Sequence, residues 1–296
     1  MPELPEVETV VIQLNQKIKG KTINKIWSDH KKMVSSHSFL DFEKLVENFK
    51  IKNVKRRGKN IFIESFQSET IWIHLKMTGH LLFKPKNLSS SLKKAFQNDP
   101  FNQYIHFIFY FKDESRLEFS DLRKFGRIRF IQAGFNDIIK HPSKYKLDSL
   151  GPEPLELTRE QFKDLIAAKI KRNQKSADKE IKPLLLDQKF IAGIGNIYAS
   201  EILFKAGINP RRKVKGLKQK EIDRLFDSVK MVLEKAIKNR GTSTSDFRDT
   251  FGQKGKNESD LMVYKRTGKR CRICGNIINR FKQDQRSTFY CPKCQK

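Results

Sequence analysis

The chain has 296 residues, with 61 Lys and Arg against 33 Asp and Glu and a formal net charge of +28. A hydrophobic content of 38% with 23 Phe supports buried cores, which excludes a disordered basic tail, and the length allows one large or two ordinary domains. No apolar run approaches the roughly 20 residues that span a bilayer, and no Lys or Arg precedes Lys17, so we expect a cytoplasmic protein that is neither secreted nor membrane-inserted. The positive surplus indicates a polyanionic partner, foremost nucleic acid, although a lysine-rich solvated surface would give the same total.

The first half of the chain predicts one helix followed by many short strands. Pro5 suits a first helical turn, and apolar residues at helical spacing then continue to Gly20, which predicts a helix over residues 5–19. The strands are expected to form an antiparallel sandwich or flattened barrel. They are predicted over residues 23–27, 51–56, 60–66, 70–75, 80–83, 104–111, 116–120 and 126–132.

The second half has a helical pattern that begins after Gly151-Pro152-Glu153-Pro154, a natural domain boundary. The expected fold is therefore α+β, with a β-sandwich domain over residues 1–150, a helical domain over 151–250 and a C-terminal segment over 251–296. Helices are predicted over residues 158–171, 182–190, 196–206 and 218–239.

A glycine-rich turn precedes the third of these helices. Gly193 and Gly195 let a ligand approach the backbone, and Asn196 can cap the helix, so this helix start is suited to a phosphate group. A tight interhelical turn that needs glycine for steric reasons explains the same pattern, and both interpretations remain open on this segment alone.

All four cysteines predict one structural zinc site. They form two Cys-x2-Cys pairs separated by sixteen residues, and such pairs supply four thiolates to a tetrahedral ion with no open position for catalysis. A disulfide framework is the alternative, but a chain without a secretion signal is expected to stay reduced. Strands over residues 276–281 and 287–290 with a turn at 282–286 complete a zinc ribbon. The predicted ligands are Cys271, Cys274, Cys291 and Cys294.

The N-terminus is acidic in a basic protein and predicts a reactive amine. Removal of the initiator methionine before Pro2 would leave a secondary amine that is far less protonated at pH 7 than a lysine, and it could attack a sugar carbon to form an iminium. Glu3 is placed to move protons. Glu6 and Glu8 lie at the start of the predicted helix, and for Glu8 we favour a complement to the helix dipole.

Five segments of the chain carry a recognisable pattern: Met1-Pro2-Glu3-Leu4-Pro5-Glu6-Val7-Glu8, Asp121-Leu122-Arg123-Lys124-Phe125-Gly126, Leu150-Gly151-Pro152-Glu153-Pro154-Leu155, Gly193-Ile194-Gly195-Asn196-Ile197-Tyr198-Ala199-Ser200-Glu201 and Gln285-Arg286-Ser287-Thr288-Phe289-Tyr290-Cys291. With these segments the chain resembles formamidopyrimidine-DNA glycosylases from end to end. That family excises oxidised purines (8-oxoguanine and formamidopyrimidines) from duplex DNA and then cleaves the strand at the abasic site by β and δ elimination, so the resemblance implies a DNA-repair hydrolase with lyase activity.

The resemblance implies the catalytic roles. Pro2 would displace the damaged base and hold the sugar as a Schiff base, Glu3 would move protons, and Glu6 would belong to the base pocket. Lys59 would serve β elimination and Arg286 the second elimination. A lysine in a hairpin turn and a solvated ribbon charge are the plain structural alternatives for these last two.

The resemblance also implies a set of DNA contacts. A base taken out of the stack leaves a hole that Met77, Arg123 and Phe125 would fill, although a methionine alone would more often belong to a core. Lys182 and Asn196, the latter in a helix–two-turn–helix element, would contact phosphates. The implied partner is double-stranded DNA with oxidised bases or abasic sites, bound by a nucleoid-associated monomer.

The chain departs from the family pattern at two residues and one loop, and two alternative functions remain open. Tyr104 occupies the position where the family has a DNA-contacting histidine, and Lys265 occupies that of a usual glycine. Residues 253–260 lack the aromatic pair that is usual in this loop, with which the family covers the flipped base. A sister-group enzyme for oxidised pyrimidines is one alternative, against which Leu4 and the Val7-Glu8 ending argue. A non-catalytic zinc-containing DNA-binding protein is the other, and it would not need an acid at the N-terminus.

Overall fold

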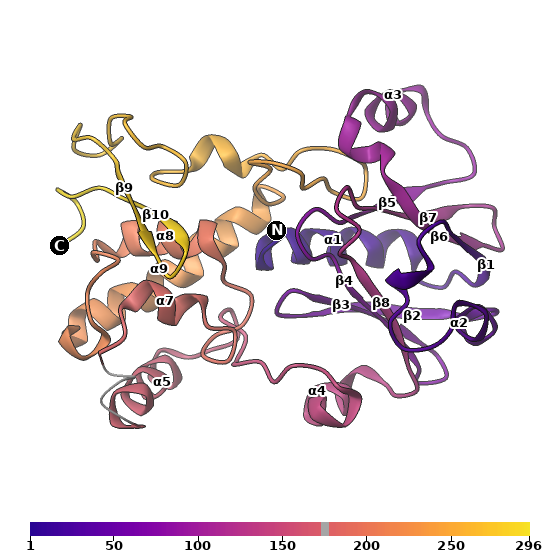
Figure 1. The fold of residues 1–296 in the computed structure, drawn as a ribbon, viewed down its shortest axis with the longest axis horizontal. Coiled ribbons are helices and arrows are strands. Elements are labelled where there is room, and N and C mark those ends of the chain that lie inside the picture. Colours follow the sequence, from indigo (N-terminus) through magenta and orange to yellow (C-terminus); the bar gives the residue numbers. More distant parts are fainter. Residues whose placement is uncertain (173–177) are drawn as a thin grey trace. The chain divides into compact units, whose positions relative to one another are not determined.

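The computed structural model describes residues 1–172 and 178–296, which form two compact units (Figure 1). The first unit contains residues 1–149 and 239–258, and the second contains residues 150–238 and 259–296 of the described chain. Among the described helices, none is long and apolar enough to cross a membrane.

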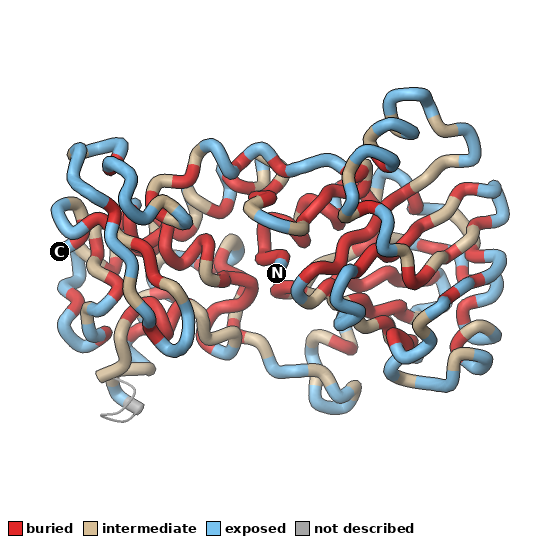
Figure 2. Tube along the Cα trace, turned by 45° about the horizontal axis from the view of Figure 1, so that its top comes forward, coloured by how far each residue is buried: buried red, intermediate tan, exposed pale blue. Residues whose placement is uncertain are grey.

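The first unit is the expected antiparallel sandwich with a leading helix, α1 (Leu4–Ile18). One sheet has the order β1-β6-β7-β5 and the other the order β2-β3-β4-β8. The apolar face of α1 packs into one core with both sheets, and most of the helix is buried (Figure 2). The strands are β1 (Ile23–Ser28), β2 (Ile51–Arg57), β3 (Asn60–Ser65), β4 (Thr70–His74), β5 (His80–Lys84), β6 (Ile105–Phe111), β7 (Arg116–Ser120) and β8 (Arg127–Ile131).

Three short helices of the first unit were not predicted: α2 (Phe39–Val46), α3 (Ser90–Asn98) and α4 (Phe135–Lys140). Serine caps begin two of them, because Ser38 Oγ accepts from Asp41 N–H and Ser89 Oγ from Leu92 N–H. Single 3₁₀ turns are η1 (Lys31–Met33), η2 (Pro100–Gln103) and η3 (Pro142–Tyr145).

The second unit is helical and ends in a two-stranded ribbon, as predicted. The helix predicted over residues 182–190 is shorter and spans Ile181–Leu186. Asp187 is its C-cap residue, and its carbonyl oxygen accepts from Phe190 N–H and Ile191 N–H in the turn that follows. The ribbon turn at 282–286 is also wrong in length: Asp284 and Gln285 alone make it, both at positive φ, so Arg286 is the first residue of a strand. The elements are α5 (Arg159–Arg172), α7 (Ile181–Leu186), α8 (Asn196–Ala206), η4 (Val214–Gly216), α9 (Gln219–Lys238), β9 (Asn279–Gln283) and β10 (Arg286–Tyr290), with η5 (Asn257–Asp260) where the chain passes between units.

Residues 239–258 pack with the first unit, whereas the sequence grouped them with the helical and C-terminal domains. Hydrogen bonds to main-chain carbonyl groups of this segment hold it there, since Phe83 N–H donates to Thr250 O at 2.9 Å and the side-chain amide Nδ2 of Asn102 donates to Gly252 O at 3.1 Å. The compact units therefore differ from the expected domain boundaries over this segment.

Candidate active site and nucleic-acid interface

The residues that follow Met1 are buried in the first unit. Pro2 is buried and Glu3 is 3% exposed, while Met1 remains accessible. Glu3 is the N-cap residue of α1, and its N–H donates to Glu6 Oε2 at 2.8 Å in the manner of a capping box. The helix start thus fixes the backbone at the residue that follows Pro2.

Glu6 joins this helix start to the segment that returns after α9. Its second oxygen accepts from Thr242 N–H at 2.7 Å, and the side chain is 1% exposed. Gly241 has φ +76° there, and a Cβ on it would lie 2.9 Å from Glu6 Cγ, so the close approach requires glycine. Both carboxylate oxygens accept main-chain N–H groups, which favours a structural role over the base-pocket role that the resemblance implies.

Lys59 occupies a two-residue hairpin turn with Gly58, between β2 and β3, and is 8% exposed. Arg56 steadies the turn, donating to Gly58 O at 2.9 Å and to Glu8 Oε2 at 2.5 Å. Glu8 therefore forms an ion pair with Arg56, and the acidic residue in the first turn of α1 is Glu6. Burial, helped by the charges of Lys76 and Lys59, lowers the pKa of nearby His74 to about 3, so this imidazole is neutral.

The electrostatics at the terminus favour an unprotonated amine. Burial lowers the pKa of the Met1 amino group below its ordinary value of 8.0, and the charge of Lys59 lowers it further. The carboxylates of Glu3, Glu6 and Asp246 oppose this effect. Asp246 was missed from the sequence because it lies in no motif and reaches the terminus only through the fold. An amine whose pKa is lowered has a larger nucleophilic free-base fraction, and nearby carboxylates and an ammonium group can accept and donate protons.

Three side chains of the first unit extend from tight turns into solvent. Met77 and Phe125 are 40% and 45% exposed, and the guanidinium of Arg123 lies 4.6 Å from the Phe125 ring centre. Buried Asp121 fixes the second turn by accepting from Gly126 N–H at 2.7 Å. Met77 is therefore not a core residue, and exposed apolar groups on fixed turns are typical of a binding surface.

Tyr104 is 37% exposed and follows η2. Its carbonyl oxygen accepts from Asp121 N–H at 2.8 Å, which links it to the turn that carries Arg123 and Phe125. The phenol of Tyr104 is thus available for one hydrogen bond at this surface.

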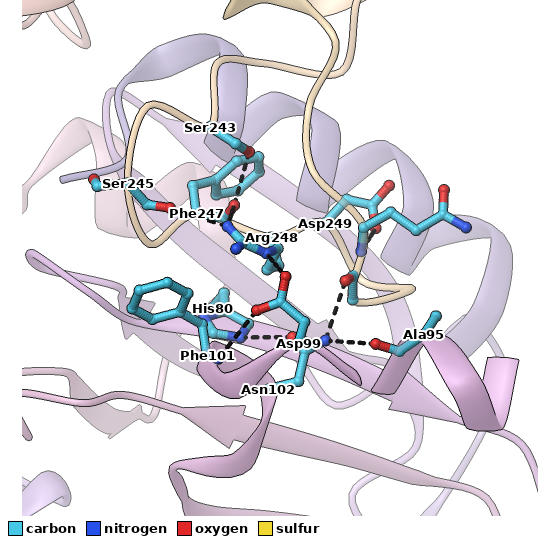
Figure 3. Close-up of polar contacts among 12 residues, drawn as sticks. His80, Ala95, Asp99, Phe101, Asn102, Ser243, Ser245, Phe247, Arg248 and Asp249 are labelled. Atoms are coloured by element: carbon cyan, nitrogen blue, oxygen red, sulfur yellow. Dashed lines mark hydrogen bonds and ion pairs between the residues drawn. The ribbon is translucent and has the colours of Figure 1, made fainter. Parts of the chain in front are cut away.

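A polar network anchors the start of the 253–260 loop to the first unit (Figure 3). Arg248, 2% exposed, donates from Nε to Asp99 Oδ2 at 2.5 Å. Asn102 donates from Nδ2 to Ala95 O and to Gly252 O, both at 3.1 Å. Because both donations come from the amide nitrogen, Asn102 Oδ1 accepts from His80 Nε2 at 3.1 Å, and burial lowers the pKa of His80 to about 4.

The second unit brings Lys182 and Asn196 together. Lys182 is 1% exposed and donates from Nζ to Asn196 Oδ1 at 2.7 Å and to Thr288 Oγ1 at 2.8 Å. Asn196 Nδ2 in turn donates to Ser287 O at 3.0 Å. These bonds connect α7, α8 and β10.

The glycine turn before α8 is braced internally. Gly193 has φ +84°, and its N–H donates to Gln188 Oε1 at 2.9 Å. The steric explanation therefore applies to Gly193, whose N–H serves the turn itself.

Arg286 lies at the edge of a cavity of about 560 Å³ in the second unit. The lining is cationic, and among the described residues none that line it is acidic. Four of its polar residues are Asn196, Lys265, Arg280 and Arg286. Arg286 and Asn196 thus share one surface, which suits a phosphate chain.

The four cysteines meet in the second unit with all sulfur atoms within 4.8 Å of one another. Cys271 Sγ lies 3.9 Å from Cys294 Sγ, and Cys274 Sγ lies 3.4 Å from Cys291 Sγ. A tetrahedral zinc ion with Zn–S bonds of about 2.3 Å requires sulfur separations of about 3.8 Å, so the donor set fits zinc and the sulfurs are too far apart for disulfides. One structural zinc ion would be held by these four thiolates, which leaves no position open for water.

Three domain families match this chain. Residues 1–128 match the formamidopyrimidine-DNA glycosylase N-terminal domain, residues 150–248 the formamidopyrimidine-DNA glycosylase H2TH domain, and residues 268–296 the zinc finger found in FPG and IleRS. The formamidopyrimidine-DNA glycosylase of Pelotomaculum thermopropionicum is 40% identical, over 100% of this chain and 99% of that protein. The corresponding protein of Carboxydothermus hydrogenoformans is 38% identical over the whole of both.

Solved structures give the same result. A mutant FPG of Lactococcus lactis in complex with Fapy-dG containing DNA has a TM-score of 0.83 and 32% identity, covering 100% of both chains. The Lactococcus lactis Fpg in complex with abasic-site DNA has a TM-score of 0.82 and 32% identity, covering 99% of both chains.

Proposed function

The chain belongs to the formamidopyrimidine-DNA glycosylase family, and from this premise we propose that Pro2, Glu3 and Lys59 carry out base excision and strand cleavage. The protein is a DNA glycosylase of base-excision repair with one structural zinc site, and lyase activity through a Schiff base is typical of its family. The relatives of known structure bind DNA with Fapy-dG or abasic sites, which supports oxidised purines in duplex DNA as the substrate.

The observation that carries this proposal is the buried amino terminus. With Met1 removed, the Pro2 nitrogen attacks C1′ of the damaged nucleotide, the bond from C1′ to the base breaks, and a proton goes to the departing base. Glu3, buried beside Pro2, is placed to hold and return protons as the sugar ring opens. Burial lowers the pKa of the Met1 amine, and the Pro2 amine that replaces it after Met1 removal is expected among the same charged groups, which supports the nucleophilic role.

Strand cleavage follows from the iminium. The C1′ iminium acidifies the hydrogens on C2′; loss of one of them to a base and departure of the 3′ phosphate give β elimination, and departure of the 5′ phosphate gives δ elimination. Lys59 is positioned on a fixed turn for the first step, and Arg286 provides a guanidinium for a phosphate oxygen. Met77, Arg123 and Phe125 are exposed side chains suited to filling the hole that the extruded base leaves.

The cellular setting belongs to the same proposal. We expect a monomer in the cytoplasm that is associated with the nucleoid, since chromosomal DNA is the substrate. The gathering of all four cysteines at one zinc site, with no disulfide among them, supports a reducing compartment.

Borohydride trapping tests the mechanism. The protein, with its mass confirming loss of Met1, is mixed with a duplex carrying 8-oxoguanine opposite cytosine or with one carrying an oxidised pyrimidine, and borohydride is added. We expect a covalent adduct with the purine lesion and much less with the pyrimidine lesion. A preparation with an N-terminal tag should bind DNA but form no adduct, whereas the same tag at the C-terminus should leave trapping intact. Absence of an adduct on every lesion would overturn the catalytic proposal.

A further inference from the structure

Lys265 has a backbone conformation that suits glycine. Its φ is +56°, in the left-handed region, where a side chain with a Cβ is disfavoured. The residue is exposed, so no packing of its side chain in the core accounts for a lysine at this position. Strain of this kind is often retained where a side chain has a function.

The conformation of Lys265 is imposed by the residues just before it. Glu201 of α8 is 6% exposed, and its carboxylate accepts from Met262 N–H at 2.8 Å, Val263 N–H at 3.0 Å and Tyr264 N–H at 2.8 Å. The Tyr264 ring also meets Phe289 of β10 with ring centres 5.1 Å apart. The chain therefore enters Lys265 from a fixed direction.

Lys265 lies at the wall of the cationic cavity. Lys265 lines it together with Arg280 of β9 and Arg286 of β10, and Asn196 at the start of α8 contributes an amide. Three cationic side chains around one cavity give it a positive potential, which favours the binding of an anion. The chemical class that fits is a chain of phosphate groups, for which guanidinium and ammonium donors are both suited.

We propose that Lys265 is a DNA-phosphate contact in this cavity and that the lysine is kept at the expense of backbone strain for this purpose. The inference rests on the proposed function in one respect, namely that the ligand is duplex DNA. The proposed phosphate contact comes from Lys265, at a position where the family usually has glycine.

The test measures binding without cleavage. Affinity for a duplex of about 20 base pairs with a non-cleavable abasic-site analogue is measured from 50 to 200 mM salt for wild type, Lys265→Gly and Lys265→Arg. Each phosphate contact contributes about 0.9 to the slope of log Kd against log salt, so Lys265→Gly should lower the slope by about 0.9. The ratio of the Kd of Lys265→Gly to the Kd of wild type should then fall by about 3.5-fold as salt rises from 50 to 200 mM. Lys265→Arg should retain the wild-type slope.

Lys146 provides a matched control. It is an exposed lysine in the first unit with φ +52°, and it does not line the cavity. Lys146→Gly and Lys265→Gly both relieve strain, so each should raise Tm by about 2 °C, but only Lys265→Gly should change the salt slope. A wild-type slope in Lys265→Gly, or an equal fall in Lys146→Gly, would overturn the proposal. Failure of the catalytic proposal would instead appear as a missing borohydride adduct with DNA binding intact.

Discussion

Lys182 Nζ donates to Asn196 Oδ1 at 2.7 Å, and this bond makes a buried lysine the support of a residue that lines the cationic cavity. The same ammonium group donates to Thr288 Oγ1 at 2.8 Å, so it connects the start of α8 to the ribbon. We infer that Lys182 orients Asn196 and does not itself meet a phosphate.

Replacement of Lys182 by methionine tests this distinction. Lys182→Met leaves the oxygens of Asn196 and Thr288 without their donor and should cost about 3 kcal/mol of stability. DNA affinity should fall while the slope of log Kd against log salt stays at the wild-type value, since no phosphate contact is lost. Lys205→Met, at an exposed position of α8, is the control. A slope lower by about 0.9 would show that Lys182 contacts phosphate directly.

Asp246 should set the acid limit of base excision. Its carboxylate raises the pKa of the Met1 amine, and we expect the same effect on the Pro2 amine after Met1 removal, so Asp246→Asn should lower that pKa and leave more free amine at acidic pH. The acid limb of the single-turnover excision rate should then move to lower pH, which a pH series on 8-oxoguanine duplex measures. Glu47→Gln, an exposed change beyond α2, should leave the profile in place. Movement of the limb to higher pH in Asp246→Asn would contradict the assignment.

The pair of Asp99 with Arg248 should stabilise the first unit. Asp99→Asn keeps an oxygen for the N-cap of η2 but leaves the guanidinium, whose side chain is 3% exposed, without its counter-charge. We expect a loss of about 2 kcal/mol in the free energy of unfolding. Both tryptophans, Trp27 and Trp72, belong to this unit, so urea unfolding followed by their fluorescence reports it alone.

The control for that change is an exposed ion pair. Glu114→Gln removes the partner of Lys86, where the side chains are 67% and 57% exposed, and should change stability by less than about 0.5 kcal/mol. Equal effects from both variants would mean that the Asp99 contact is no stronger than a surface pair.

His80 should make the first unit sensitive to acid. Burial lowers its pKa to about 4, against 6.5 for an ordinary histidine, so the unfolded chain binds the proton first as pH falls. The stabilisation is complete above pH 6.5 and is lost between pH 6.5 and 4, with about 2 kcal/mol gone by pH 5. Urea midpoints at pH 7.5 and 5.0 should therefore differ less in His80→Gln than in wild type. His37→Gln, at an exposed position, should retain the full wild-type difference.

Much of the fold was predictable from local patterns. The spacing of apolar residues located α1 and the eight strands to within two residues, because alternation and helical periodicity survive in the sequence of each element. Helices α2 and α3 were missed because they are only eight and nine residues long, which is shorter than the 11 to 18 residues over which helical periodicity is read. Their serine caps were the available signal.

The site was predictable only where motifs specify it. The cysteine spacing predicted the zinc ligands, and the N-terminal octet predicted the reactive end. The positions of Asp246 and Thr242 beside that end could not be predicted, since main-chain hydrogen bonds between residues far apart in sequence leave no pattern in residue type.

The hydrogen bond from Thr242 N–H to Glu6 has a consequence for the folding of the chain during its synthesis. The two residues are 236 positions apart, so the amino terminus, which leaves the ribosome first, receives this partner only when the chain is nearly complete. Sandwich strands can assemble earlier, but the surroundings of Pro2 are completed only after residues 239–258 have been synthesised and have packed with the first unit. A chain that ends before residue 242 would therefore lack one of the two main-chain donors that hold Glu6 beside the reactive end.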